Sequence, residues 1–552
     1  MPFQVSPSVV VTEKDLTNII PAVSTSNGAT VGQFAWGAVE QITIVDNEEE
    51  LVSLFSKPSN TVFTDFMVTS SFLAYASGLK VIRVVDDSSA LNASATATAS
   101  GSGVLVKNGE DYDTKNFTSG TDLFIAKYPG VLGNSLGVAY ADTAGFNDVD
   151  SNDVPTWPWH DLFQSAPETN EFHVVVYDAD GTITGLANTV LEVFAYVSTQ
   201  AGEIAFDGTS AYFKTKINRA SRWVWVATES LLTGTSDGVD LGGGNDGAAI
   251  VSADRLRGWE MFKDSERVDI NLLFVGGADA ITSKWVIDNV VEVRKDCVVC
   301  VSPMTNDVVG IANEATKLAA IKTTRNSFGS TSYGIMDPTF KYMYDRYNDV
   351  NRWIPINGDI AGCMARTDAE YDPWFSPAGY EKGRIKNASK ISFYQPKSIR
   401  DELYKIGINP ILEDGVNGPI LYGDKTLLTR PSAFGHINVR RLFIVLQKAI
   451  ATASKYMLFE QNDEYTRARF VNMIEPFLAD VQGRRGIEGF RVVCDHTNNT
   501  SEVTSQGEFI ADIYIIPINS INVIKLNFIA LRSGVDFEEI VMSSNSNQVP
   551  SI

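Results

Sequence analysis

Ser135 is the residue whose neighbours come nearest to a known catalytic pattern. It lies in GNSLG, residues 133–137, which has the G-x-S-x-G spacing of a hydrolase nucleophile elbow. An elbow needs a strand before the serine and a helix after it, so that the hydroxyl is exposed on a sharp turn. Here a turn-forming stretch, YPGVLG, precedes the serine and a strand-like stretch, VAYA, follows it. We therefore predict a turn that leads into a strand, and an esterase-like hydrolase that rests on Ser135 is kept as an alternative.

Histidines that could serve as a general base are few. The chain contains four of them, His160, His173, His436 and His496. None forms a visible acid–histidine pairing with the serine, and no H-E-x-x-H metalloprotease motif occurs. Since histidine is the side chain that titrates near neutral pH, this leaves little material for acid–base catalysis.

Cys297 and Cys300 have the C-x-x-C spacing of redox and zinc sites. In a strand, residues three apart point to opposite faces, and CVVC lies in an apolar segment without a flanking glycine or proline. Neither a second cysteine pair nor a nearby histidine completes four zinc ligands. The pattern therefore predicts two buried, small apolar residues.

Three glycine-containing segments resemble ligand-binding loops but lack a necessary residue. LGGGNDG at 241–247 has no following lysine, and GPILYGDKT at 418–426 has Asp424 where a phosphate would lie. DADG at 178–181 begins like a calcium loop but lacks an acidic residue at position five and a glutamate at position twelve. We predict turns at all three, and hence no catalytic residue, no metal site and no cofactor.

The composition describes a large, acidic, globular chain. Its 552 residues are 44% hydrophobic, which is more than one core normally holds and indicates three or four domains or insertions. A net charge of −22 argues against nucleic acid as a partner. Four cysteines fit a reducing cytoplasm, and residues 1–20 lack the basic start and apolar run of a secretion signal. The most apolar stretch, 509–531, is interrupted by polar residues, so we expect no membrane insertion.

Alternating patterns along the chain predict an α+β multidomain protein. Residues 28–85 give a β-α-α-β opening of an α/β core, with helices at 48–55 and 63–75. A small, polar stretch at 88–103 predicts a linker, and strands then dominate up to about 227, with a hairpin turn at Asp180-Gly181. An α/β pattern returns after residue 250. The last third predicts an amphipathic helix at 438–458, a second helix from about 463 broken or kinked at Pro476, and strands at 490–495, 508–518 and 521–531.

These patterns divide the chain into six parts. We expect an N-terminal arm at 1–20, the first part of an α/β core at 21–92, an inserted β-rich outer domain at 93–250, the second part of the core at 251–395, a C-terminal helix-plus-sheet domain at 396–532, and a C-terminal arm at 533–552. The two arms carry short β-prone runs with no partner segment close by, so we predict that they pair with other subunits. The residues expected to form these strands are Val9, Val10, Val11, Thr12, Phe537, Ile540 and Val541.

Several segments together resemble the tail sheath proteins of contractile-tailed, myovirus-type bacteriophages. They are SPSVVVTEKD, VGQFAWGAVEQITIVDNEEELVSLFSKPS, YPGVLGNSLGV, LGGGNDG, YDRYNDVNRWIPINGDIAG, PWFSPAGYEKG, LYGDKTLLTRPSAFGHINVRRLF and FRVVCDHTNNT, in family order from about residue 6 to residue 540. The stretch at 88–121 is shorter than the extra protruding domain of the largest relatives, which implies that this domain is absent here.

The resemblance implies a structural subunit and not an enzyme. Such subunits stack as six-membered rings around a tail tube and contract to drive the tube through the host cell envelope. The implied partners are the protein itself, the tail tube protein, and the baseplate and tail terminator proteins, in a virion tail assembled in the host cytoplasm. A sheath of a bacterial contractile injection system, pyocin or type VI-like, is the other reading. We expect the 438–485 helices to face the tube, through Glu464, Arg467, Arg469, Glu475, Arg484 and Arg485, although a merely solvated helix face fits these charges equally well.

Overall fold

The computed structural model of the protein describes residues 24–115, 117, 121–205, 207–228, 232–522 and 525–526. The chain divides into two compact units, Met1–Ile518 and Asn519–Ile552. The helices and strands given below all lie in the first unit, and they confirm an α+β multidomain protein.

The centre of this unit is a six-stranded sheet with the order β15-β14-β13-β1-β3-β2. All neighbouring strands are parallel except β2, which pairs antiparallel with β3. The strands are β1 (Gly28–Gly32), β2 (Ile42–Val45), β3 (Leu79–Arg83), β13 (Leu272–Phe274), β14 (Val298–Val301) and β15 (Gly334–Met336). Every residue of β1, β13, β14 and β15 is buried, as expected for parallel strands covered on both faces.

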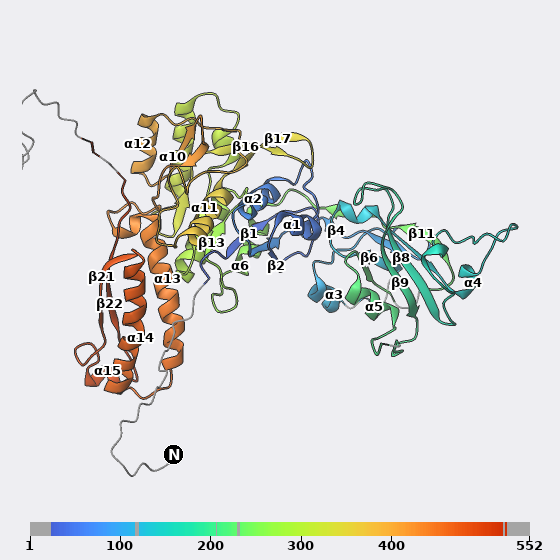
Figure 1. Ribbon diagram of the computed structural model, residues 1–552. Helices are drawn as coiled ribbons and strands as arrows, with labels where there is room; N and C mark the ends of the chain where they lie inside the picture. The colour runs from blue at the N-terminus through green and yellow to red at the C-terminus, as the bar shows by residue number, and fades with distance from the viewer. Residues whose placement is uncertain are drawn as a thin grey trace, which may run out of the picture. The chain divides into compact units, whose positions relative to one another are not determined.

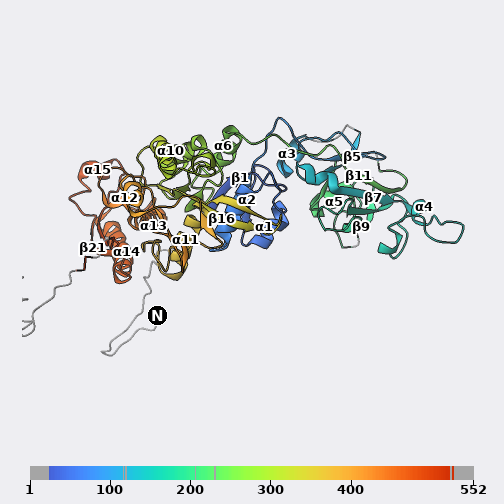
Figure 2. The ribbon, with the colours of Figure 1, turned by 90° about the horizontal axis from the view of Figure 1, so that it is seen from above.

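Helices cover both faces of this sheet. Figure 2 shows α6 and α10 on one side of the sheet, and α2 and α11 on the other. The helices of this core are α1 (Glu48–Phe55), α2 (Thr64–Leu73), α6 (Ser252–Glu260), α7 (Ala280–Val286), a π-helical turn (Ile287–Val291), α8 (Glu292–Arg294), α9 (Thr305–Val308), α10 (Glu314–Ser327) and α11 (Asn357–Glu370). The predicted helix at 48–55 is confirmed, and the one at 63–75 is confirmed within two residues at each end.

A β-rich insertion leaves the core after β3 and returns before α6. Its two ends meet, because β4 (Ala90–Leu91) pairs with β12 (Asn245–Asp246). Two sheets, β10-β6-β5 and β11-β7-β8-β9, form its body. Their strands are β5 (Ser94–Thr96), β6 (Asp122–Ala126), β7 (Leu136–Ala141), β8 (Glu171–Asp178), β9 (Thr189–Ser198), β10 (Val224–Val226) and β11 (Ser236–Asp240); the helical pieces are α3 (Gly109–Lys115), η1 (Val131–Ser135), α4 (Thr143–Phe146), η2 (His160–Leu162) and α5 (Phe213–Ala220).

Two details of this region were predicted wrongly. The stretch at 88–103 is not a linker, since it contains β4 and β5, and its alanines Ala93 and Ala95 are small because they are buried in the domain core. The hairpin turn is not at Asp180-Gly181. Instead β8 pairs with β9 across the loop 179–188, and the buried Asp178 carboxylate accepts backbone N–H groups from Gly181 and Ile183 in that loop.

The rest of the chain adds a small sheet, a hairpin and the C-terminal domain. The elements that pack on the core are β16 (Phe340–Asp345), β17 (Val350–Pro355), β18 (Lys390–Ile391), α12 (Lys397–Lys405), β19 (Ile411–Asp414), β20 (Gly418–Leu421) and η4 (Ala433–Gly435). The C-terminal elements are α13 (Ile437–Ser454), η5 (Lys455–Met457), α14 (Glu464–Gly483), β21 (Ile487–Val493), α15 (Ser501–Ser505) and β22 (Asp512–Pro517). No helix within the described ranges combines the length and the apolar character needed to cross a membrane.

The C-terminal helices and the first two strands are where the sequence predicts them, with one correction. Of the kink or break predicted at Pro476, the break does not occur, because α14 continues through the proline to Gly483. Pro476 and Asn472, whose carbonyl loses its partner, both lie on the exposed side of the helix, where water can replace the missing hydrogen bond. The predicted strand at 521–531 is not seen at residues 521–522 and 525–526, and its other residues lie outside the described part of the chain.

Candidate functional site: the C-terminal sheet and its open edges

The C-terminal domain has a hydrophobic core of its own between α13, α14 and the sheet. Helix α14 contributes residues at helical spacing, Phe470, Ile474, Leu478 and Val481, which form one buried stripe. Figure 1 shows α13 and α14 side by side, with β21 and β22 beside them. The buried residues of this cluster are Trp374, Leu442, Leu446, Phe470, Ile474, Leu478, Val481, Ile487 and Cys494.

Strands β21 and β22 form a two-stranded antiparallel sheet, which we call the C-terminal sheet. Its register runs from Ile487 opposite Pro517 to Val493 opposite Asp512, with an irregularity at Gly489. Within the described part of the chain, neither strand has a second partner, so both edges of the sheet are open. An open edge presents unpaired N–H and C=O groups to which another extended chain can pair.

One face of the C-terminal sheet is covered and the other is bare. Ile513 and Ile515 of β22 pack against the helices, whereas Tyr514 and Ile516 point outward with 60% and 58% of their surfaces exposed. An isolated two-stranded sheet is marginally stable in water, and this one is supported by its packing against α13 and α14. Its two edges remain open to further strands.

The seven residues predicted to form arm strands lie outside the described residues. Val9, Val10, Val11 and Thr12 precede residue 24, and Phe537, Ile540 and Val541 follow residue 526. The described chain starts beside the first turn of α13, where the Arg441 guanidinium donates to the Thr25 carbonyl at 3.2 Å. The start of the described chain also contacts the core, because the Asn271 side chain donates to the Ser24 carbonyl at 2.7 Å.

The six charged residues predicted to face the tube do not share one surface. Glu464 and Glu475 lie about three helical turns apart on one side of α14, and Arg469 lies about 140° around the helix from Glu464. Five of the six are exposed, namely Glu464, Arg469, Glu475, Arg484 and Arg485, and Arg467 is half-buried. Of the five, Arg484 also pairs with Asp372 within the chain.

Two of the four arginines are engaged in contacts within the chain. Arg467 is half-buried and donates to the Asn462 side chain at 3.2 Å. Arg484 pairs with Asp372, and its guanidinium carbon lies 5.1 Å from the centre of the Trp374 ring. Both arginines therefore make contacts that stabilise the domain itself.

A buried ion pair joins the C-terminal domain to the core. Arg441 of α13 reaches both carboxylate oxygens of Asp368 on α11, and the two side chains are 5% and 3% exposed. Burial raises the pKa of the Asp368 carboxyl, and the Arg441 charge opposes that rise. This contact was not predicted. Two adjacent basic residues on the buried side of an apolar helix do, however, indicate a buried acidic partner.

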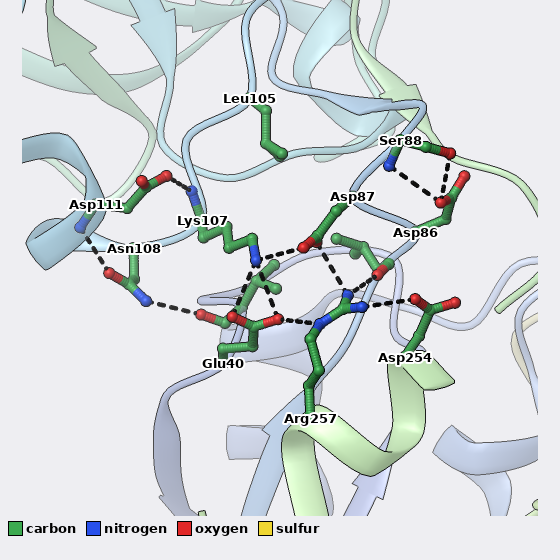
Figure 3. A network of polar contacts seen from close by, with 12 residues as sticks. Glu40, Asp86, Asp87, Ser88, Leu105, Lys107, Asn108, Asp111, Asp254 and Arg257 are labelled. Atoms are coloured by element: carbon green, nitrogen blue, oxygen red, sulfur yellow. Dashed lines mark hydrogen bonds and ion pairs between the residues drawn. The ribbon is translucent and has the colours of Figure 1, made fainter. Parts of the chain in front are cut away.

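A second polar network fastens the insertion to the core (Figure 3). Lys107 of the insertion contacts Asp87 Oδ2 at 2.6 Å and Glu40 Oε2 at 3.0 Å. Arg257 of α6 contacts Glu40 at 2.8 Å, Asp87 at 3.1 Å and Asp254 at 2.9 Å. Burial lowers the pKa of the Lys107 ammonium, but its hydrogen bonds to Asp87 and Glu40 prevail and raise it. The network ties together both chain segments that cross between core and insertion.

Comparison with known proteins assigns this architecture to a family. The family model of the phage tail sheath protein central domain matches residues 248–427, and that of the phage tail sheath C-terminal domain matches residues 429–530. The tail sheath protein of Vibrio phage KVP40 is 31% identical over 670 aligned residues, covering 97% of this chain and 99% of the relative. The chain belongs to the phage tail sheath family. That alignment is longer than the 552-residue chain, so the Vibrio phage protein contains segments with no counterpart here.

Further relatives and solved structures agree with this assignment. The tail sheath protein of Enterobacteria phage T4 is 30% identical, over 97% of this chain and 99% of its own. The sheath tail protein of Listeria innocua superposes with a TM-score of 0.56 over 90% of this chain and 96% of that one, at 14% identity. The contracted helical sheath of the anti-feeding prophage gives 0.51 over 96% and 99%, at 13% identity. The sheath fold therefore extends over nearly the whole chain.

The G-x-S-x-G motif of this sheath protein is explained by packing. The 3-10 turn η1 ends at Ser135 and strand β7 begins at the next residue, as the sequence predicts. A Cβ on Gly133 would lie 2.9 Å from the Ala126 methyl, and one on Gly137 would lie 2.2 Å from the Tyr177 ring. The Ser135 hydroxyl is buried and bonds to the Asp180 carboxylate at 3.1 Å. The glycines are thus required for close contact, and the serine for a loop anchor.

Replacing Ser135 by alanine tests this explanation. We expect Ser135→Ala to lose about 1 kcal/mol of stability through the missing hydrogen bond. Hydrolysis of p-nitrophenyl acetate should be at the uncatalysed background rate for both proteins. A rate above background that disappears in the variant would restore the hydrolase alternative.

The other ligand-like motifs also have structural explanations. Cys297 and Cys300 are buried free thiols, and burial raises the pKa of each. The loop 241–247 is clamped by Asn134, which accepts from the Gly244 N–H at 2.7 Å and donates to the Gly244 carbonyl at 2.9 Å. Asp424 is buried and accepts a hydrogen bond from the Tyr404 hydroxyl at 3.0 Å. Each motif therefore has a role in packing or in loop structure at its own position.

Asp337 is a buried carboxyl that has no cation among its hydrogen-bond partners. Ser302 Oγ donates to it at 2.6 Å and the Thr339 N–H donates at 3.2 Å. Burial outweighs these two hydrogen bonds and, with the nearby Asp359 charge, raises the pKa of Asp337 to about 8. The side chain is therefore protonated in the native protein at neutral pH.

This pKa predicts a pH-dependent effect of Asp337→Asn. Because the folded-state pKa lies above the unfolded-state value, the stability that Asp337 contributes is complete below about pH 4 and is lost as the pH rises to about 8. Asparagine does not titrate, so the variant should gain up to about 1.4 kcal/mol per pH unit relative to the parent through that window. Urea midpoints at pH 5, 6, 7 and 8 measure the difference. A difference between Asp337→Asn and the parent that stays constant over these pH values would refute the assignment.

Proposed function

We propose that the protein polymerises into a contractile sheath in which the arms of each copy complete the C-terminal sheets of its neighbours. The single observation that carries this proposal is the two-stranded sheet, which has both edges open within the described part of the chain and exposes Tyr514 and Ile516 on its outer face. An arm of 20 residues spans at most about 65–70 Å, which is enough to reach an adjoining subunit. Added strands would cover the open edges and form backbone hydrogen bonds with the unpaired N–H and C=O groups there.

The assembly follows from subunits joined head to tail. Such contacts generate rings and helices, and we assign six-membered rings stacked around the tail tube, with the baseplate and the tail terminator protein at the ends. Contraction exchanges one set of contacts between globular bodies for another while the strand pairing of the arms persists. The protein acts mechanically in the virion tail and not as an enzyme, and it assembles in the host cytoplasm.

The division of labour within the chain is part of the same proposal. Residues 396–532 form the assembly domain, residues 93–250 the outer domain, and residues 21–92 with 251–395 the core between them. The tube-facing charges are the exposed ones of the predicted set, Glu464, Arg469, Glu475, Arg484 and Arg485. Phage relatives of nearly full length favour a phage tail over a bacterial injection system, and neighbouring capsid genes or secretion genes would separate the two.

Electron microscopy of the purified full-length protein tests the proposal. Negative-stain images at rising protein concentration should contain tubes with a constant diameter, either extended or already contracted. A protein that stays monomeric in these images and in analytical ultracentrifugation would contradict it.

A further inference from the structure

The carboxyl end of the core sheet contains a crevice at the point where strand order reverses. β1 has β3 on one side and β13 on the other, and the chain adds its later strands, β14 and β15, beyond β13. In open α/β sheets, ligands bind outside the carboxyl ends of the strands at this switch point. In this protein the side chain of Asp65, from α2, occupies the position.

Asp65 is held as a protein holds a bound carboxylate. One oxygen accepts the Gln33 N–H, which follows β1, at 2.9 Å, and the other accepts the Gly277 N–H, which follows β13, at 2.9 Å. Arg255 of α6 approaches both oxygens, at 2.8 and 3.3 Å. Asp65 and Arg255 are both buried. Two backbone donors and a two-pronged guanidinium form a complete set of partners for a carboxylate.

Glycines leave room for this carboxylate. A Cβ on Gly32 would lie 2.5 Å from the Asp65 Cβ, and a Cβ on Gly276 would lie 2.5 Å from Asp65 Oδ1. Gly276 also has a φ of +62°, which disfavours other residues. The cavity that adjoins the site, lined by Gly276, Gly277, Asp279 and residues 303–306 among others, has about 190 Å³, less than ligand pockets usually offer.

We propose that this edge of the core is a preformed carboxylate-binding cradle whose permanent ligand is the Asp65 side chain. A free small carboxylate binds in the cradle when that side chain is removed. Asp65 comes before the insertion in the chain, whereas Arg255 and Gly277 come after it, so the bound carboxylate fastens together the two halves of the core. The crevice that other α/β proteins use for a ligand is thereby closed, and the core serves as a solid mechanical body.

Chemical rescue tests the cradle. Asp65→Ala keeps the Cβ and leaves space for formate, and Asp65→Gly leaves space for the larger acetate. Sodium formate at 200 mM should raise the melting temperature of Asp65→Ala by about 2–4 °C over 200 mM sodium chloride, following a saturable dependence on concentration. Acetate should do the same for Asp65→Gly and should be weaker than formate on Asp65→Ala.

Controls separate binding from a general salt effect. The parent protein and Asp65→Asn, which fills the space with an amide, should respond equally to formate and chloride. The double variant Asp65→Ala with Arg255→Met should lose the rescue, because the cation is gone. If Asp65→Ala does not fold in chloride, its soluble yield on refolding in formate replaces the melting temperature. Equal responses of all variants, or none in Asp65→Ala, would overturn the proposal whether or not the protein forms tubes.

Discussion

A protein trimmed of residues 1–20 and 533–552 is expected to stay folded and to form no ordered tubes. The helices, strands and hydrophobic clusters described above lie within residues 24–518, so trimming removes none of the residues that form them. The open edges of the C-terminal sheet would remain without added strands. Circular dichroism and thermal melting should match the full-length protein, and negative-stain images should contain single particles at concentrations where the full-length protein forms tubes.

Two matched variants show which property of the arms matters. Val9→Asp with Val11→Asp keeps the length of the N-terminal arm but disfavours its pairing as an apolar strand, so the critical concentration for assembly should rise at least tenfold. Val9→Ile with Val11→Ile keeps β-propensity and should assemble normally. Ordered tubes from the trimmed protein would refute arm exchange, and misfolding of the trimmed protein would show that the arms complete their own subunit.

The parts of the fold that sequence predicts best are those governed by local periodicity. The stripe of apolar residues four apart in α13 and the run at 48–55 each specify a helix without reference to the rest of the chain. The prediction of a linker at 88–103 was wrong because small residues are typical both of linkers and of tightly packed strands. Only the burial of Ala93 and Ala95 in the folded protein distinguishes the two. The helix does not break at Pro476, because the free-energy cost of a proline inside a helix depends on whether water can bond to the carbonyl that loses its N–H partner.

The candidate site was predictable only in part. The β-prone segments at the two ends of the chain predicted strand exchange between subunits. The strands of the C-terminal sheet were predicted from alternating apolar and polar residues. The contacts that position the domains were not, because they join residues far apart in the chain: Asp65 with Arg255, Glu40 with both Lys107 and Arg257, and Asp368 with Arg441. The sequence shows Asp65 and Arg441 as charged residues in apolar settings, but it does not identify their partners.

Removing the Arg441 side chain is expected to be among the most destabilising single changes in the described part of the chain. Arg441→Met leaves the Asp368 carboxylate buried without its cation, and breaking a buried pair in this way costs about 3–5 kcal/mol. The loss should appear as a lower urea midpoint for unfolding of the C-terminal domain. It should also appear as faster amide exchange in α11 and α13, the two helices that the pair joins.

Two comparisons make the Arg441 result specific. Lys322→Met breaks an exposed pair with Glu402 and should cost at most about 1 kcal/mol, since water screens both charges. Adding Asp368→Leu to Arg441→Met removes the orphaned carboxylate and should recover most of the loss, because two apolar side chains of similar volume can replace a buried pair. If Arg441→Met were as stable as Lys322→Met, the pair would not be the joint between the assembly domain and the core. Other contacts of α13 with the core would then hold the domain in place, among them the Lys448–Asp269 ion pair and the hydrogen bond from Arg440 to the Tyr333 hydroxyl.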